Sequence, residues 1–431
     1  MATTAIVILA ISYLFLFSEK LNRAVAALLG AVLMVVSGVL NQDTAIEGID
    51  FNTIFLLIGM MIMVGISEKS GMFEYAAVLS AKKVNADPRK LLAVLGIITA
   101  VLSGLLDNVT TIMLIVPITI QITRKLKVPC YPYLILEIFA SNIGGAATLI
   151  GDPPNIMIGS ALGLSFMDFV RELALVMTII LAILIVAFDW LWKKRLNTTD
   201  ELRAELLKTD EKKLICNKKL FRQSLTVLGL TIAGFAAADF IKLPNSTVAL
   251  FGAAILLLLE SLKDNNHRRD EKVEEILQKI DWTTIFFFAG LFVIVHGLEV
   301  TGVLQKAGEY LRVISKGDLE KASFAVLFFS TVLSAVVDNI PFVAVMIPML
   351  KSVEQSFGGR EVMMPLWWAL SMGACLGGNG SLIGASANVI AAGIAARSNT
   401  PIHFIKFFIY SLPVTFFTII IAAIYLKLAY F

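Results

Sequence analysis

Two carboxylate–amide pairs interrupt long apolar runs of the chain. Asp107 is followed by Asn108, and Asp338 is followed by Asn339. An Asp at such a turn can cap the helix that follows, because its side chain accepts hydrogen bonds from the first free backbone N–H groups. Ser or Thr could cap a helix without the cost of burying a charge. Two buried carboxylates at matching places therefore indicate proton or cation handling.

Two glycine-rich stretches interrupt other apolar runs. Residues 144–155 read Gly-Gly-Ala-Ala-Thr-Leu-Ile-Gly-Asp-Pro-Pro-Asn, and residues 377–388 read Gly-Gly-Asn-Gly-Ser-Leu-Ile-Gly-Ala-Ser-Ala-Asn. So much Gly and Pro prevents continuous helix, and unwound backbone at membrane depth is tolerated only where it is buried or lines a cavity. Some of the glycines can serve close helix packing. The polar side chains gathered here nevertheless predict a binding site made of Asn142, Gly145, Thr148, Asp152, Asn155, Asn379, Ser381, Ser386 and Asn388.

Acidic residues, but no Lys or Arg, fall deep within the apolar runs. This pattern favours a neutral cargo, a cation or proton coupling over a polyanionic cargo, although helix N-termini can bind anions unaided. The three cysteines Cys130, Cys216 and Cys375 are too widely spaced for a disulfide framework or a zinc site. Metalloprotease and ATP-binding motifs are absent from the sequence. We therefore expect no enzyme and no cofactor other than a coupling proton or sodium ion.

The elements that position these residues must be membrane spans. Hydrophobic residues make up 58% of the 431 residues and charged residues only 16%, against roughly 45–50% and about 25% in soluble proteins. This composition excludes a soluble enzyme, a nucleic-acid-binding protein and a disordered chain. A span needs roughly 20 apolar residues. We expect ten crossings, at 4–17, 24–40, 52–67, 133–164, 172–192, 224–241, 246–262, 282–298, 366–396 and 405–427.

An internal repeat organises the chain. Residues 50–59 match 281–290, residues 102–117 match 333–348, and residues 144–155 match 377–388. Five crossings in each half make the two copies inverted, and inverted repeats with broken helices are typical of secondary transporters. A duplicated channel is the alternative. The predicted all-α polytopic architecture has an N-terminal repeat (1–192), a linker (193–223) and a C-terminal repeat (224–431), with re-entrant hairpins at 91–123 and 322–353, whose halves are each too short to cross, and broken helices at 133–164 and 366–396.

The basic residues predict the orientation. Placing 18–23, 68–90, 124–127, 193–223, 261–281 and 397–406 in the cytoplasm gives that side 27 of the 36 Lys and Arg residues. Because cytoplasmic loops carry an excess of Lys and Arg, we expect a multi-pass protein of the inner cell membrane with both termini outside.

These motifs closely resemble the arsenical pump membrane protein (ArsB) and melanosomal P protein family of the ion transporter superfamily, which also holds the NhaD antiporters and the divalent anion–sodium symporters. The resemblance covers nearly the whole chain. It implies an elevator-type transporter, with a moving transport domain carried by a dimeric scaffold. Carried over by position, it implies a first site of Asp107, Asn108, Thr110, Asn142, Thr148, Asp152 and Asn155 and a second of Asp338, Asn339, Asn379, Ser381, Ser386 and Asn388. That Asp107 and Asp338 carry protons is expected from the burial of the two symmetric carboxylates.

The leading hypothesis is proton-coupled efflux of a small inorganic species, arsenite or antimonite. Sodium/proton antiport follows, and then sodium-coupled dicarboxylate or anion symport and an anion channel. The symporter branch has Ser-Asn-Thr at its hairpin tips, and the Asp residues found here speak against dicarboxylate symport. The expected partners are a small inorganic substrate, the lipid bilayer, a second copy of the chain in a homodimer and, for a primary pump, a separate ATPase subunit; nucleic acid is not expected.

Overall fold

The computed structural model describes residues 1–18, 21–262 and 266–431, and within these ranges the chain forms helices and loops without strands. The N-terminal half contains α1 (Ala2–Ser18), α2 (Arg23–Val36), α3 (Gln42–Glu47), α4 (Phe51–Glu68), α5 (Met72–Lys83), α6 (Pro88–Leu105), α7 (Asn108–Leu126), α8 (Tyr131–Ala146), α9 (Pro153–Leu162) and α10 (Phe166–Trp192). The linker contains α11 (Asp200–Leu207) and the 3₁₀ turn η1 (Glu211–Leu214).

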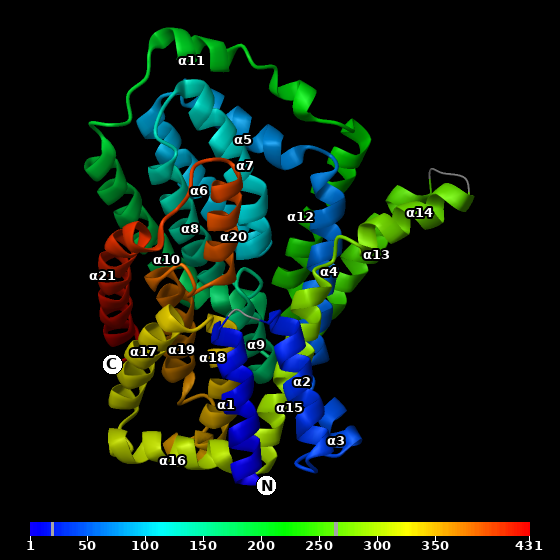
Figure 1. The fold of residues 1–431 in the computed structure, drawn as a ribbon, viewed down its shortest axis with the longest axis vertical. Helices are drawn as coiled ribbons and strands as arrows, with labels where there is room; N and C mark the ends of the chain where they lie inside the picture. Colours follow the sequence, from blue (N-terminus) through cyan, green and yellow to red (C-terminus); the bar gives the residue numbers. More distant parts are fainter. Residues whose placement is uncertain (19–20, 263–265) are drawn as a thin grey trace.

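The C-terminal half repeats this order (Figure 1). It contains α12 (Lys218–Ile241), α13 (Asn245–Ser261), α14 (Asn266–Leu277), α15 (Trp282–Val300), α16 (Val303–Ser315), α17 (Leu319–Val336), α18 (Asn339–Ser352), η2 (Glu354–Phe357), α19 (Met364–Gly377), η3 (Gly378–Gly380), α20 (Ser386–Arg397) and α21 (Phe404–Tyr430).

Eight helices of the described residues are long and apolar enough to cross a membrane: α4, α6, α7, α10, α12, α15, α17 and α21. The expectation that each half of a hairpin is too short to cross is therefore wrong for α6, α7 and α17, which have 18, 19 and 18 residues. These helices extend beyond the apolar runs because their end turns take in charged residues, such as Arg89 in α6 and Arg124 in α7. The helices α1, α2 and α13 are shorter, with 14 to 17 residues.

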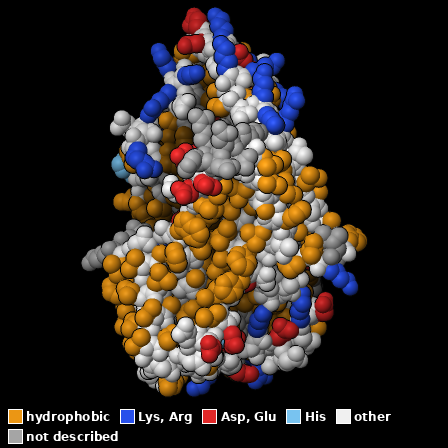
Figure 2. All heavy atoms as spheres, turned by 90° about the vertical axis from the view of Figure 1, so that its right-hand side faces the viewer, with side chains coloured by type: hydrophobic (Ala, Val, Ile, Leu, Met, Phe, Trp, Pro, Cys, Tyr) orange, Lys and Arg blue, Asp and Glu red, His pale blue; other side chains and the backbone are white. Residues whose placement is uncertain are grey.

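The surface agrees with a membrane protein. Figure 2 shows a broad apolar area across the middle of one face, with Lys and Arg gathered towards its upper end. The last helix, α21, exposes large apolar side chains along its length, among them Ile405, Ile409, Leu412, Phe416 and Phe417. Such a surface is suited to lipid and would be costly in water.

The two halves run in opposite directions. The hairpin of α6 and α7 enters from the upper end in Figure 1, whereas the hairpin of α17 and α18 enters from the lower end. Each hairpin turns at its Asp, which is the N-cap of the second helix: Asp107 accepts from the N–H of Thr110, and Asp338 accepts from the N–H of Ile340. The capping predicted for these residues is confirmed.

A second symmetric feature is the close packing of α13 on α4 and of α2 on α15. A Cβ on Gly59 would lie 2.7 Å from the carbonyl carbon of Ala249, and a Cβ on Gly290 would lie 2.6 Å from that of Ala27. Gly59 and Gly290 match in the repeat, so each half contributes one helix to each pair. The helices α1, α2 and α15, together with α4, α12 and α13, form what we call the outer frame.

Two connecting helices, α5 and α16, join the outer frame to the hairpins. In Figure 1 α16 lies across the lower end of the molecule and α5 lies near the upper end. Each begins after a glycine in the left-handed region, Gly71 with φ +77° and Gly302 with φ +75°. The linker packs on α5: Glu211 accepts from Lys82 at 2.5 Å, and this hydrogen bond holds the pKa of Glu211 below its ordinary value.

The two glycines give a testable pair. Replacing Gly302 by Ala should lower the free energy of unfolding by about 1–2 kcal/mol, because only the left-handed backbone opposes the new methyl group. Gly71→Ala should cost more, since its Cβ would also lie 1.9 Å from the carbonyl oxygen of Leu214 in the linker. Denaturant unfolding of both variants in the same detergent would measure this order, and equal stabilities would contradict it.

Candidate functional site

Each broken helix is held by one asparagine. Asn155 donates from Nδ2 to the carbonyl oxygens of Ala146 (3.1 Å) and Thr148 (2.9 Å). Asn388, its repeat partner, donates from Nδ2 to the carbonyl oxygens of Gly378 (2.7 Å) and Ser381 (2.8 Å). Both asparagines are fully buried. Because buried carbonyl groups need donors, these two amides replace the hydrogen bonds that the breaks remove.

Hydroxyl groups join each break to its hairpin. Thr148 donates to the carbonyl oxygen of Gly104 in α6 at 2.6 Å, and Ser381 donates to that of Ala335 in α17 at 2.6 Å. Within the first break the backbone also approaches itself closely: a Cβ on Gly145 would lie 2.5 Å from the carbonyl oxygen of Gly151. Gly145 therefore helps to shape the break.

Asp152 occupies the centre between the two hairpin tips. Asn108 donates to its Oδ1 at 3.2 Å, and Asn339 donates to Oδ1 and Oδ2 at 3.3 Å each. Asp152 is fully buried. Although it stands at the N-cap of α9, its side chain makes no capping bond, because Pro153 and Pro154 follow and offer no N–H groups. The carboxylate is free to face the asparagines.

A chain of amides joins the two breaks. Asn142 of α8 donates to Oδ1 of Asn379 at 2.9 Å and to Oδ1 of Asn388 at 3.0 Å. From the other half, Ser371 of α19 donates to Oδ1 of Asn155 at 2.6 Å. Within residues 1–18, 21–262 and 266–431 the Nδ2 atom of Asn379 has no hydrogen-bond partner. We call the buried group of Asn108, Asn142, Asp152, Asn155, Asn339, Asn379 and Asn388 the asparagine cluster.

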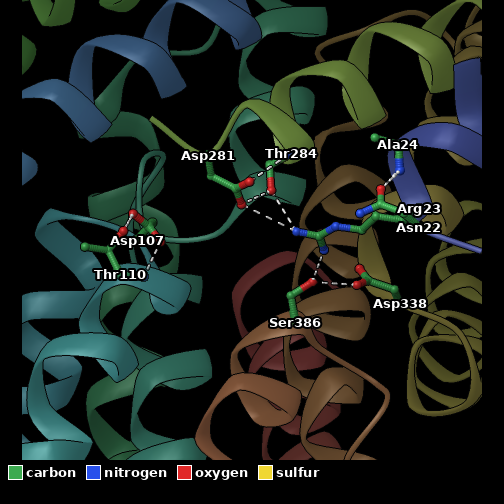
Figure 3. Close-up of polar contacts among 9 residues, drawn as sticks. All are labelled: Asn22, Arg23, Ala24, Asp107, Thr110, Asp281, Thr284, Asp338 and Ser386. Atoms are coloured by element: carbon green, nitrogen blue, oxygen red, sulfur yellow. Dashed lines mark hydrogen bonds and ion pairs between the residues drawn. The ribbon is translucent and has the colours of Figure 1, made fainter. Parts of the chain in front are cut away.

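The two tip carboxylates lie outside this cluster. Asp107 accepts from the backbone N–H of Thr110 at 2.7 Å and from its hydroxyl at 2.5 Å. Asp338 accepts from the hydroxyl of Ser386 at 2.8 Å. Asp107 and Asp338 therefore bond to different neighbours (Figure 3), and the carboxylate between the two halves is Asp152. Within the described residues no group of His, Cys, Asp and Glu could hold a metal ion.

A cavity of about 510 Å³ opens beside the cluster. Its lining includes Asp152, Asn108 and Asn339 of the cluster, together with Asp107, Thr110 and Ser386. Its polar lining further includes Arg23, Glu68, Lys279, Asp281 and Thr284.

Arg23, at the start of α2, is the main departure from the predicted site. Its Nη1 donates to the hydroxyl of Ser386 at 2.7 Å, and its Nη2 donates to the hydroxyl of Thr284 at 2.7 Å. Nη2 also lies 3.7 Å from Oδ2 of Asp281, the N-cap of α15. Figure 3 shows the guanidinium group reaching from the outer frame to Ser386, which in turn bonds to Asp338.

The absence of Lys and Arg from the depth of the apolar runs does not keep basic residues from the cavity. Arg23 and Lys279 were placed in cytoplasmic loops by sequence position, yet both line the cavity. Lys279 is paired with Glu68 at 2.7 Å. Both basic residues adjoin apolar runs, where the sequence resembles an ordinary span end, and only the packing of distant helices brings them to the cavity.

One feature of the internal repeat could have predicted this part of the site. Asp281 and Thr284 match Asp50 and Thr53 in the repeat, and each Asp accepts from the Thr hydroxyl of its own helix. Two matching N-caps facing the breaks could have pointed to this surface. Ser160 of α9 donates to Asp50 at 2.9 Å, so a broken helix of the first half also meets an N-cap of the outer frame.

We expect Asn388→Ala to lower the free energy of unfolding by at least about 2 kcal/mol, because each buried polar group left unsatisfied costs about 1–3 kcal/mol. The change removes the donor to Gly378 and Ser381 and the acceptor for Asn142. Denaturant unfolding in detergent measures the loss, with the exposed Gln278→Ala as the matched control. An Asn388→Ala protein as stable as the control would show that the breaks do not depend on this amide.

Comparisons with known proteins agree with this architecture. An uncharacterised transporter of Mycobacterium tuberculosis is 38% identical over 435 residues, covering 100% of this chain and 99% of that protein. The mouse P protein is 32% identical over 511 residues, covering 99% of this chain and 60% of the P protein, which confirms the resemblance to the P protein family. The crystal structure of the Alcanivorax borkumensis YdaH transporter, described as having an unusual topology, has a TM-score of 0.57 at 12% identity and covers 94% of this chain and 96% of that one.

At 12% identity, the similarity to the YdaH transporter supports the fold and nothing more. The sequence matches support membership in a common family. The family model described as citrate transporter (CitMHS) matches residues 13–373. A match of this extent covers both hairpins, the first break and the start of α19, so the chain belongs to the citrate transporter family of membrane transport proteins.

Proposed function

We propose that the protein is a secondary transporter driven by a proton that binds Asp152. The observation that supports this most directly is a fully buried carboxylate whose partners are the neutral amides of Asn108 and Asn339. The start of α9 offers it a partial positive charge, but an unpaired charge in a membrane interior stays costly. A proton, or failing that a sodium ion, would cancel the charge during transport.

The position of Asp152 between the hairpin tips supports coupling to movement. Asn108 comes from the first hairpin and Asn339 from the second, so a displacement of either tip changes the donors around the carboxylate. Loading with a proton would then favour one arrangement of the tips and unloading another. Such a difference between states is what links ion binding to conformational change.

The proposed movement is of the elevator type. Hairpins and broken helices would move as a transport domain against the outer frame. Among the described residues, polar contacts that join these parts are those of Arg23 to Ser386, of the Tyr13 hydroxyl to the carbonyl oxygen of Pro341 at 2.8 Å, and of Ser160 to Asp50. So few hydrogen bonds between the parts favour sliding over rigid attachment. A second copy of the chain would brace the frame.

The first cargo we propose is arsenite or antimonite, exported by exchange with protons. The undissociated oxyacids are neutral, and the lining of the cavity offers matching neutral groups in Asn108, Thr110, Asn339 and Ser386. Citrate is the second candidate, favoured by the family description and by the guanidinium group of Arg23 at the cavity, because Arg matches the fork geometry of carboxylates.

For the orientation, we propose that the upper end in Figure 1 faces the cytoplasm of a cell that holds the protein in its inner membrane. The linker helix α11 lies at that end, whereas the N-terminus lies at the lower end. Both termini would then lie outside, in keeping with the excess of basic residues in the linker.

Asp152→Asn should abolish proton-driven transport, because an amide cannot exchange a proton. In proteoliposomes carrying a pH gradient, arsenite and citrate accumulation should fall at least about tenfold. This factor corresponds to a loss of about 1.4 kcal/mol of the free energy that drives accumulation. The exposed Asp43→Asn on α3 is the control. Accumulation that is still driven by the pH gradient in Asp152→Asn would contradict the proposal. Accumulation driven by a sodium gradient in the unmodified protein would show that the coupling ion is sodium and not a proton.

Arg23→Asn tests the cargo. Ala27 of α2 packs on Gly290 as Ala249 of α13 packs on Gly59, so α2 and α13 occupy equivalent places in the two halves. In this alignment Arg23 is equivalent to Asn245, and the variant gives α2 the residue that starts α13. Loss of a charge-assisted hydrogen bond costs about 1.5–3 kcal/mol, which should raise the KM for citrate by about 10-fold to 150-fold. The KM for arsenite should change little. A citrate KM equal to that of the unmodified protein would exclude Arg23 as its ligand.

A further inference from the structure

A second buried carboxyl group lies apart from the asparagine cluster. Glu137 of α8 is fully buried, and its Oε1 accepts from the hydroxyl of Thr119 in α7 at 2.5 Å. Its Oε2 atom is buried and has no hydrogen-bond partner among the residues that the structure describes. A carboxylate with one bonded oxygen and no cation is poorly stabilised in such a place, whereas the protonated acid carries no charge to bury.

The internal repeat shows that the fold does not need polar groups here. Pro117 matches Pro348, so Thr119 matches Leu350; Gly144 matches Gly377, so Glu137 matches Leu370. Leu350 and Leu370 are both fully buried. The C-terminal half thus fills the equivalent place with two apolar side chains. A polar pair kept where two leucines pack equally well points to a role other than packing.

No charged group compensates Glu137. The titratable groups on its own helix are the hydroxyls of Tyr131 and Tyr133, of which Tyr133 donates to the carbonyl oxygen of Pro88, and the thiol of Cys130 stands just before the helix. In the described part of the chain Glu137 forms no ion pair and only the bond to Thr119. The helix α19 and the turn η3 carry no Asp, Glu, Lys, Arg or His. The charged side chains of the other elements packed on α8 are Arg89 and Lys90 of α6, Arg124 and Lys125 of α7, Asp168, Arg171, Glu172 and Asp189 of α10, Arg397 of α20, and Lys406 and Lys427 of α21, of which Lys406 lies over the ring of Tyr131.

Most of these groups lie at helix ends and are exposed or paired; Arg89, for instance, bonds to Asp189. They do not reach Glu137, so its charge would depend on burial and on Thr119 alone. Glu137 is six residues from the first residue of α8, which is about 9 Å along the helix axis. The site therefore lies near the upper end, where the linker is, and a small separation of α7 from α8 would open it to water.

We propose that Glu137, held by Thr119, is a second proton-binding site of the transporter, distinct from Asp152. It would take up a proton when α7 and α8 close and release it at the upper end when they separate. The proton moves between water and one carboxylate oxygen, and no other bond is made or broken. This inference rests on the proposed proton coupling but concerns a different residue, so the two can fail separately.

The test uses the full chain with Asp152→Asn as the background, in which the cluster carboxyl cannot titrate. Infrared difference spectra of proteoliposomes between about pH 5 and about pH 9 should show a buried carboxylic acid that ionises. Glu137→Gln should remove this signal, and proton release measured with a pH dye should fall by about one per chain. Persistence of the carboxylic acid signal in Glu137→Gln would overturn the assignment.

A purely structural role predicts a different result. Glu137 would then stay protonated through the whole pH range, and its removal would leave the proton count unchanged; either finding overturns the proposal. The double variant Thr119→Leu with Glu137→Leu copies the pair used in the other half and guards against misfolding. It should fold and lose the same proton as Glu137→Gln. If it instead retains the titrating signal, Glu137 is not the site.

Discussion

Two helices are interrupted in the membrane interior, where no water is available. The structure depends on hydrogen bonds to the backbone groups that these interruptions leave unpaired. A membrane interior offers no solvent to the freed carbonyl groups, and an asparagine side chain can donate two hydrogen bonds from one nitrogen. Asn155 and Asn388 do so in the two halves. The oxygen of each amide stays available as an acceptor, and Asn142 and Ser371 use it to join one half to the other. The same residues therefore hold the breaks and join the two halves of the chain.

The two halves serve as references for each other. Where they agree, as in Thr148 and Ser381 or Gly59 and Gly290, the shared residue supports the fold. Where they differ, one half shows that the fold tolerates a neutral residue. In the repeat the equivalent of Asp152 is Ala385, and the equivalent of Arg23 in the matching helix α13 is Asn245. The charged member of each pair is therefore not required for folding, and its cost is best explained by transport.

The sequence predicted the all-helical membrane architecture, the repeat and both breaks, because Gly, Pro and Asp at matching places have local effects on helices. It also named every member of the asparagine cluster. It could not rank them: Asp107 and Asp338 attract attention as equivalent residues, yet each caps its own helix, while Asp152 lies between the tips. Arg23 was missed because its role depends on Ser386, which is 363 residues away. Helix lengths were underestimated where charged end turns continue an apolar run.

The contacts of Ser386 link opening to the exposure of charge. Its hydroxyl donates to Asp338 and accepts from Arg23, so one side chain joins the second hairpin tip to the outer frame. In the first half the broken helix α9 meets the outer frame through Ser160 and Asp50, a contact without a cation. Displacement of α20 and the second hairpin tip must therefore separate a guanidinium group from the neighbourhood of Asp338, whereas displacement of α9 breaks only a hydroxyl contact. Separating opposite charges in a poorly solvated site costs more than breaking a single hydroxyl bond. An anion that pairs with Arg23, or a cation that pairs with Asp338, would lower this cost, so ion entry into the cavity would favour separation of α20 from the outer frame first.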